Sequence, residues 1–357
     1  MTTNPVLVEL LRGGMVESAH RGALAVIDAD GALLCALGDV ERPIFPRSAV
    51  KALQALPLVE SGAAERLQLG DEALALACAS HNGEPRHVEV ASDMLARAGL
   101  DAAVLECGTH WPGLDTAQRE LAARGELPSA LHNNCSGKHA GFVCFGCGLA
   151  SGDVAGWLRG YVKAGHPLMR EVGSALAAVT GADLDRAPRG TDGCSIPTYG
   201  IALRDLARGF ARFGSGVGLA PRRAAAARRL RQAVAATPFM VGGTGRFDTR
   251  VMERLGERAF VKVGAEGVYC AALPGRGLGV ALKIDDGNTA RAAEVAMAAV
   301  IEACVSLSGE EARFVHSLSE VTLRNWNGIE VGGLRAGTAL RSALGAGTRI
   351  DRARTEA

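Results

Sequence analysis

Short apolar strands gather near both ends of this chain, whereas its middle has helical spacing, and this distribution limits the folds open to it. Near the N-terminus, two apolar runs between residues 23 and 36 flank an Asp-Gly pair, which is typical of a β-hairpin. Towards the C-terminus, glycine and proline turns divide three more apolar runs. These runs predict strands at 259–263, 267–274 and 277–284.

From about residue 60 to 240, apolar residues recur at helical spacing, and a further long helix is predicted over 288–306. The economical packing is one mainly antiparallel sheet, built from both chain ends and flanked by helices, with a helical region inserted between them. We therefore predict an α/β fold. We predict one unit over residues 1–336, followed by a flexible C-terminal tail over 337–357. Within the unit, residues 1–60 and 240–336 would form the sheet part, and residues 61–239 the helical part.

The composition allows a large core and argues against several kinds of partner. The 357 residues are 48% hydrophobic with a net charge of +1, which argues against nucleic acid and anionic membranes. No segment approaches the roughly 18 apolar residues that cross a bilayer, and the N-terminus does not resemble a signal peptide. The nine cysteines are more typical of free thiols in a reducing cytosol than of a disulfide framework. We therefore expect a cytoplasmic protein.

Ser48 and Lys51 lie three residues apart, just behind Pro46, in a predicted helix. Side chains at this spacing share a helix face, so the hydroxyl and the amine can meet. A buried lysine has a lowered pKa and can take a proton from a serine nucleophile. The alternative is a serine cap beside a surface lysine, which the flanking alanines make less natural.

Two further positions are candidates for the same chemistry. Ser80 follows an apolar helix within the polar segment 80–83, a frequent place for catalysis but also for an ordinary turn. Lys262 interrupts an apolar strand two residues before Gly264. A lysine there can face a cleft, although an edge-strand lysine that discourages aggregation has the same pattern.

A dense cluster of reactive side chains occupies residues 132–141. The alternative is a helix start capped by asparagine or serine, which the density of the cluster makes less natural. A glycine-rich loop at 190–200 exposes a second set. Sulfur and nitrogen ligands suit zinc, so the fold would form a metal site if it joined the two segments, although their spacing is not that of a zinc finger. The candidate ligands are Cys135, His139, Asp192 and Cys194.

Seven segments, in order from about residue 9 to 335, resemble those of the asparaginase II family, also called class 3 or rhizobial-type L-asparaginases. The order of hairpin, S-x-x-K helix, helical middle and lysine strand also resembles the folds of serine β-lactamases, penicillin-binding proteins and glutaminases. The seven segments are RGGMVESAHRGALAVID, PRSAVKALQALPL, ASHNGEP, NNCSGKHAGF, DGCSIPTYG, GGTGRFDT and RNWNGIEVG.

This resemblance implies an L-asparaginase, which hydrolyses the side-chain amide of L-asparagine to L-aspartate and ammonia. It implies two serine–lysine tandems and a zinc ion that assists substrate binding, and it implies a homodimer. One zinc ligand would be a lysine, which must lose its proton to bind the metal. The implied tandems are Ser48 with Lys51 and Ser80 with Lys262; the zinc ligands are Cys135, Lys138 and Cys194; Arg47, His139 and Asp192 would line the substrate site.

Two alternatives stay open. A penicillin-recognising serine hydrolase would use a similar serine and lysine, but such enzymes usually act outside the cytoplasm. A non-catalytic protein that binds zinc or an amino acid would need the same polar cleft. The sequence also leaves open whether asparagine or glutamine is preferred, which serine attacks, and what the loop at 237–249 does.

Overall fold

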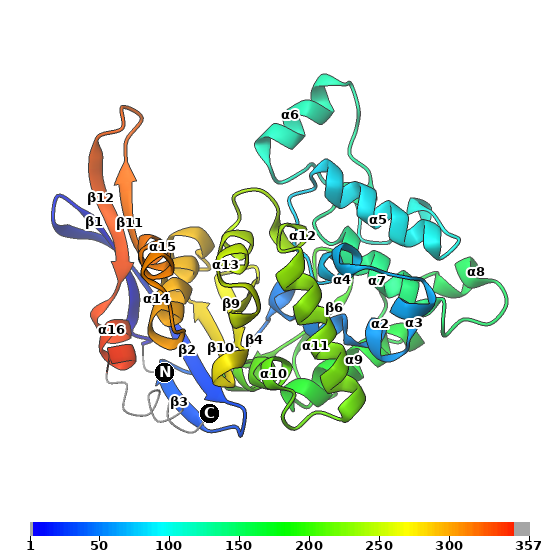
Figure 1. The fold of residues 1–357 in the computed structure, drawn as a ribbon, viewed down its shortest axis with the longest axis horizontal. Helices are drawn as coiled ribbons and strands as arrows, with labels where there is room; N and C mark the ends of the chain where they lie inside the picture. Colours follow the sequence, from blue (N-terminus) through cyan, green and yellow to red (C-terminus); the bar gives the residue numbers. More distant parts are fainter. Residues whose placement is uncertain (1–2, 346–357) are drawn as a thin grey trace. The chain divides into compact units, whose positions relative to one another are not determined.

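The structure is a computed structural model, and it describes residues 3–345 of the chain. These residues form two compact units, each assembled from separate chain segments (Figure 1). The first unit takes residues 3–49, 200–218 and 258–345, and the second takes residues 50–199 and 219–257. The long strands gather in the first unit and most helices in the second, so the predicted α/β class is confirmed.

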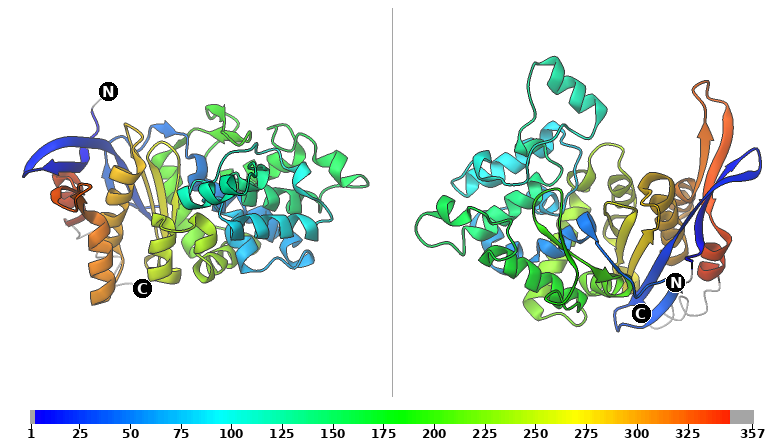
Figure 2. Two further views of the ribbon diagram at one scale, coloured as in Figure 1. Left: turned by 90° about the horizontal axis from the view of Figure 1, so that it is seen from above. Right: turned by 180° about the vertical axis from the view of Figure 1, so that it is seen from behind.

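The first unit contains an antiparallel sheet that joins both ends of the chain, as the strand pattern predicted (Figure 2). Its strand order is β11-β12-β1-β2-β10-β9-β8, with β3 paired to β2. The long strand β2 pairs with β1 along its first half and with β10 along its second half. The strands are β1 (Val6–Arg12), β2 (Met15–Asp28), β3 (Leu33–Leu37), β8 (Phe260–Val263), β9 (Val268–Leu273), β10 (Leu278–Ile284), β11 (Glu320–Arg324) and β12 (Glu330–Ala336).

Strands β8 and β9 are buried at every residue, and β10 at all but one. Their continuous apolar sequences suit this position, because helices α10 (Leu203–Ser215) and α14 (Glu294–Cys304) pack against this part of the sheet. Helix α10 comes especially close at Gly279, where an added Cβ would overlap the backbone of Ala207 and Ala211. The strand can therefore accept only glycine there without moving the helix.

The second unit is built around helix α7 (Ser136–Gly146), all of whose residues are buried. Helices α2, α4, α5 and α9 contact it (Figure 1). Gly137 and Gly141 let α4 approach closely, since a Cβ at Gly137 would overlap Leu76. The helices of this unit are α1 (Lys51–Gln54), α2 (Leu56–Glu60), α3 (Ala63–Arg66), α4 (Asp71–Ala77), α5 (Pro85–Arg97), α6 (Asp115–Ala123), α7, α8 (Val154–Leu158), α9 (Pro167–Thr180), α11 (Pro221–Ala236), α12 (Phe239–Gly242) and α13 (Phe247–Leu255).

Short elements complete both units. Two small antiparallel pairs join β4 to β7 in the first unit and β5 to β6 in the second. The remaining elements are β4 (Pro43–Ile44), β5 (Arg189–Thr191), β6 (Pro197–Tyr199), β7 (Ile201–Ala202), α15 (Gly309–Ser319), α16 (Thr338–Gly345), the 3₁₀ helices η1 (Arg47–Val50), η2 (Ala102–Val104), η3 (Ala130–His132), η4 (Gly256–Arg258) and η5 (Pro274–Arg276), and a π-helix η6 (Thr289–Ala293) that precedes α14.

The predicted hairpin, the three predicted C-terminal strands and the helix over 288–306 are all present. The boundaries of the units differ from the predicted parts. Helices α1, α2 and α13, which we grouped with the sheet, lie in the second unit, and α10 lies with the sheet. Helix α10 has an apolar face that covers β10, and sequence spacing alone does not reveal which element a helix covers. A single functional unit over 1–336 stays a prediction.

The first part of the predicted tail is helical. Residues 338–345 form α16, whose Leu340 is fully buried where the helix contacts β1 and β3. The rest of the predicted tail lies outside the described residues. Among the helices that the structure describes, none is both long and apolar enough to cross a membrane.

We predict that Gly279→Ala lowers the free energy of unfolding by about 1–3 kcal/mol, because its methyl group would push α10 away from β10. Gly275→Ala is the matched control, since a Cβ there meets nothing within 4 Å. The control should change stability by less than about 0.5 kcal/mol. Urea unfolding followed by circular dichroism measures both. Equal midpoints for the two variants would contradict the close approach of α10.

Candidate active site

Lys51 is the first residue of helix α1, and its amine is buried in the second unit. Its Nζ lies 2.9 Å from Ser80 Oγ, 2.5 Å from the carbonyl oxygen of Ala79 and 3.4 Å from that of Asn134. Burial is the main cause that lowers the pKa of Lys51 below its ordinary value. The alternative of a surface lysine is therefore wrong.

Ser80 is held by backbone pairing between the segment after α4 and the end of helix α12 in the second unit. Its own N–H donates to the carbonyl oxygen of Val241, and Asn82 N–H donates to that of Gly242. The ring of His81 next to it is buried, with Nε2 3.0 Å from Ser136 Oγ and Nδ1 accepting the N–H of Gly83. The polar segment after α4 is therefore a fixed support for Ser80 and not a solvent-exposed turn.

The glycine-rich segment after α12 reinforces this support. The buried carboxylate of Glu84 accepts hydrogen bonds from the Thr244 N–H at 2.8 Å and the Thr244 hydroxyl at 2.6 Å. Asn82 Oδ1 accepts from Arg246 Nη1 at 3.2 Å. Gly243 has a φ of 99° and leaves no room for a Cβ beside Glu84. Part of the loop at 237–249 thus anchors the Ser80 segment.

A second buried cluster joins two cysteines and a lysine in the same unit. Lys138 Nζ, on α7, donates to Cys194 Sγ at 2.9 Å, and Cys194 lies in the turn between β5 and β6. A hydrogen bond from Cys194 lowers the pKa of Cys135 well below its ordinary value, and the amines of Lys51 and Lys138 lower it further. The same hydrogen bond raises the pKa of Cys194. These opposite shifts favour the negative charge of the pair on Cys135, with Cys194 as the hydrogen-bond donor.

The pKa of Lys138 responds differently from that of Lys51. Burial lowers it, but the sulfurs of Cys135 and Cys194 raise it more, so it lies above its ordinary value. The three residues that the resemblance implied as zinc ligands therefore converge. The larger candidate set with His139 and Asp192 does not, since the described residues hold no group of three His, Cys, Asp or Glu side chains placed to bind a metal.

The other predicted substrate residues lie as follows. His139 is fully buried on α7, and burial lowers its pKa well below the ordinary value. Its Nδ1 lies 2.6 Å from the hydroxyl of Tyr161. Asp192 is half-buried, and its carboxylate accepts the N–H of Gly193 at 2.8 Å. Arg47 lies in η1 with a φ of 51°.

Ser48 and Lys262 belong to the first unit, whereas Lys51 and Ser80 belong to the second. Ser48 is half-buried in η1. Lys262 is fully buried on β8, with Nζ 3.0 Å from the carbonyl oxygen of Val263, so it is not a solvent-exposed edge lysine. The tandems Ser48–Lys51 and Ser80–Lys262 each combine residues of both units and stay predictions.

The sequence did not reveal the contact between Lys51 and Ser80, because Lys51 begins α1 whereas Ser80 lies in the segment after α4, and the two share no spacing pattern. It also missed Tyr161, which lies in an irregular segment between α8 and α9 without a motif around it. Burial of a tyrosine next to a histidine leaves no signal in a single sequence.

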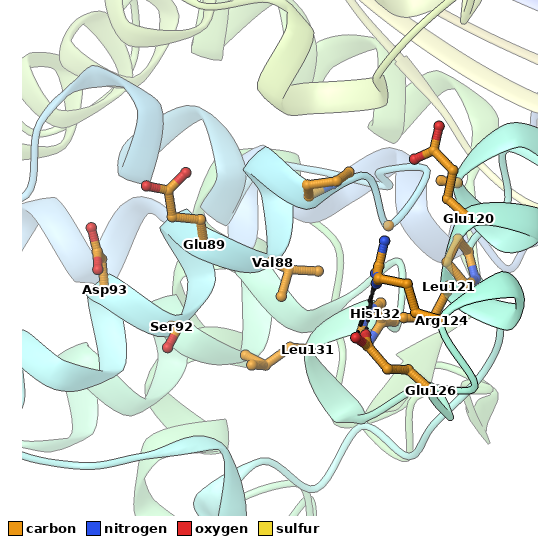
Figure 3. Close-up of a pocket in the computed structure, with 14 residues that line it drawn as sticks. Val88, Glu89, Ser92, Asp93, Glu120, Leu121, Arg124, Glu126, Leu131 and His132 are labelled. Atoms are coloured by element: carbon orange, nitrogen blue, oxygen red, sulfur yellow. Dashed lines mark hydrogen bonds and ion pairs between the residues drawn. The ribbon is translucent and has the colours of Figure 1, made fainter.

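A separate pocket of about 450 Å³ lies between α5, α6 and η3 (Figure 3). Among the described residues that line it are Glu89, Asp93 and Glu120, together with an ion pair between Arg124 and Glu126. None of the predicted site residues is among them. This mostly exposed, acidic hollow is therefore distinct from the buried serine, lysine and cysteine cluster.

Comparison with known proteins gives one finding about the whole chain. The sequence model of a protein family described as L-asparaginase II matches residues 8–336. This range contains every predicted site residue. A search of curated proteins found no match.

We predict that the metal-free protein keeps the ultraviolet absorbance of one thiolate near neutral pH. The pKa of Cys135 is depressed, so the thiolate persists as pH falls below the ordinary cysteine pKa of about 8.5 and disappears only when pH falls through the depressed value. Cys135→Ser should remove this absorbance. Cys144→Ser is the control, because burial raises the pKa of Cys144 to about 12 and keeps it a thiol. Absorbance that develops only in alkaline solution would contradict the assignment.

Proposed function

The chain belongs to the L-asparaginase II family, and from this premise we propose that it hydrolyses the side-chain amide of L-asparagine to L-aspartate and ammonia. One observation carries the chemical part of the proposal. The buried amine of Lys51 lies within hydrogen-bond distance of the hydroxyl of Ser80. A serine next to a lysine with a lowered pKa is a combination that acyl-transfer enzymes use.

The surroundings of Lys51 suit a neutral amine. A neutral amine has two N–H bonds and one lone pair. The carbonyl oxygens of Ala79 and Asn134 can accept the two N–H bonds, and the lone pair then remains for proton exchange, with the hydroxyl of Ser80 within reach as a relay. We therefore assign Lys51 as a general base in amide hydrolysis.

Acyl transfer in two steps follows from this assignment. The family resemblance assigns the attack on the amide carbon to Ser48, three residues before Lys51 in the chain, and Lys51 accepts the proton of Ser48. A proton passes through Ser80 to the departing ammonia, and water then hydrolyses the ester to release L-aspartate. The contact between Lys51 and Ser80 supports this proton path. The support of Ser80 by Lys262 is assigned on the family resemblance.

Substrate binding is assigned to Arg47, His139 and Asp192. A guanidinium and a carboxylate are the groups that match the carboxylate and ammonium of an amino acid. We also propose, on the same resemblance, a β-lactamase-like arrangement of sheet and helices, a homodimer and a cytoplasmic location. The antiparallel sheet built from both chain ends supports the first of these.

We further propose that Cys135, Lys138 and Cys194 hold a zinc ion. The donor set fits, because it offers two sulfurs and one nitrogen that already converge in a buried place. Bound zinc would supply a fixed positive charge that helps to hold the carboxylate of the amino acid. The cluster's own contribution is to favour the ionised form of Cys135, because the Cys194 hydrogen bond and the two amines lower its pKa.

The two alternative functions predict different outcomes in one set of assays. A penicillin-recognising hydrolase would open a chromogenic β-lactam and release no ammonia from asparagine. A binding protein would be stabilised by L-aspartate and would turn over neither substrate.

We predict that the native chain releases ammonia from L-asparagine and that Lys51→Met lowers this rate about 10²–10⁴-fold, because the general base is lost. Lys163→Met is the matched control, since Lys163 is exposed, and it should keep the native rate. The assay is run in parallel with L-glutamine, which settles the preference between the two amides. A trapped acyl adduct is expected on Ser48. An adduct on Ser80 would move the attack to that serine, and a Lys51→Met variant with native activity would refute the proposed base.

We predict that Cys135→Ser and Cys194→Ser each weaken zinc binding at least about 10–100-fold. Mutation of a residue that only supports a metal ligand weakens binding by this much, so loss of a ligand itself should cost at least as much. Zinc binding should also weaken as pH falls, because the thiols and the amine of Lys138 must lose their protons to bind metal. Competition titration with a chromophoric chelator measures the affinity. Cys147→Ser, at the end of α7, is the control and should bind zinc as the native chain does. Native affinity in both site variants would place the zinc elsewhere.

A further inference from the structure

The ring of His139 has two nitrogens in different situations. Nδ1 lies 2.6 Å from the hydroxyl oxygen of Tyr161. Nε2 is buried and has no hydrogen-bond partner among the described residues. Both side chains are fully buried, so bulk water is not a substitute partner.

Counting protons assigns the tautomer of His139. The oxygen of Tyr161 accepts a hydrogen bond from the Glu106 N–H at 3.1 Å, and its other contact in the described part of the chain is His139 Nδ1. A buried phenol needs an acceptor for its single proton, and Nδ1 is the acceptor within reach. Nδ1 therefore accepts, and the proton of the neutral ring lies on Nε2.

Tyr161 is itself held in place from two sides. Gly160 N–H, on its N-terminal side, donates to the Glu106 carboxylate at 2.7 Å, and Tyr161 N–H donates to the carbonyl oxygen of Leu158 at 2.9 Å. The tyrosine ring meets the His139 ring edge-on, with 5.6 Å between centroids. The hydroxyl therefore has little freedom to leave Nδ1.

We propose that Tyr161 is a positioning residue, which holds His139 in the Nε2–H form so that this N–H can donate to an oxygen of the bound amino acid. The identity of the ligand rests on the proposed function. The resemblance assigns His139 to the substrate site but says nothing of its tautomer or of Tyr161. A buried N–H without an acceptor is costly, and a ligand oxygen removes that cost.

The first test needs neither turnover nor a variant. In protein labelled with ¹⁵N-histidine, the His139 spectrum should show Nδ1 without a proton and Nε2 with one. Addition of L-aspartate should shift the Nε2 signal most. A ring protonated at Nδ1 in the native chain, or an Nε2 signal that L-aspartate does not move, would overturn the proposal. Because the spectrum is independent of catalysis, absence of asparaginase activity would refute the proposed function alone.

The second test separates positioning from a purely structural role. Tyr161→Phe should raise KM for L-asparagine about tenfold and change kcat less than about threefold, because ligand binding must first restore the tautomer. Tyr199→Phe removes a half-buried hydroxyl elsewhere in the unit and should leave KM unchanged.

Tyr161→Phe made in a His139→Gln background completes a double-mutant cycle. Glutamine keeps an N–H donor but has no tautomer to select, so Tyr161→Phe should add less than about a twofold change in KM. An equal rise in KM in both backgrounds would show that Tyr161 acts on the fold and not through His139, and would overturn the proposal.

Discussion

The second unit depends on the burial of two amines, those of Lys51 and Lys138. Removing a charged amine from water costs several kcal/mol unless other groups replace its solvation. The chain supplies those groups from the ends of its elements: Ala79 and Ser80 just after α4, Asn134 just before α7, and Cys194 in the turn of the β5–β6 hairpin. The positions of these elements and the chemistry of the site are therefore set by the same contacts.

Helix α7 makes these contacts geometrically possible. It is buried along its whole length, and Gly137 and Gly141 allow α4 to approach its backbone. The close approach brings the end of α4, which leads to Ser80, next to the start of α7, which carries Lys138 and His139. A larger residue at Gly137 would separate Ser80 from this helix, so the small residues of a packing interface determine where the reactive groups lie.

The fold and the site were predictable to different extents. Periodicity located the C-terminal strands and the hairpin, because residues such as Val268 to Leu273 must be apolar to be buried in a sheet. The convergence of Cys135, Lys138 and Cys194 followed from resemblance, since no spacing rule relates a helix start to a distant hairpin turn. The contact of Lys51 with Ser80 could not be predicted, because it depends on how the fold brings the first residue of α1 to the segment after α4, and residue type does not encode that.

The two lysines occupy similar depths but respond in opposite directions, and this difference separates their roles. Around Lys51 the hydrogen-bonded carbonyl oxygens and hydroxyl carry no charge, and desolvation outweighs the attraction of the Cys135 and Cys194 sulfurs, so its pKa falls. Around Lys138 the sulfurs of Cys135 and Cys194 outweigh desolvation, and its pKa rises. Neighbouring groups whose environments move their pKa values apart are typical of divided acid–base roles. Lys51 is thus suited to accept a proton during hydrolysis, whereas Lys138 balances the Cys135 thiolate until a metal ion supplies the positive charge in its place.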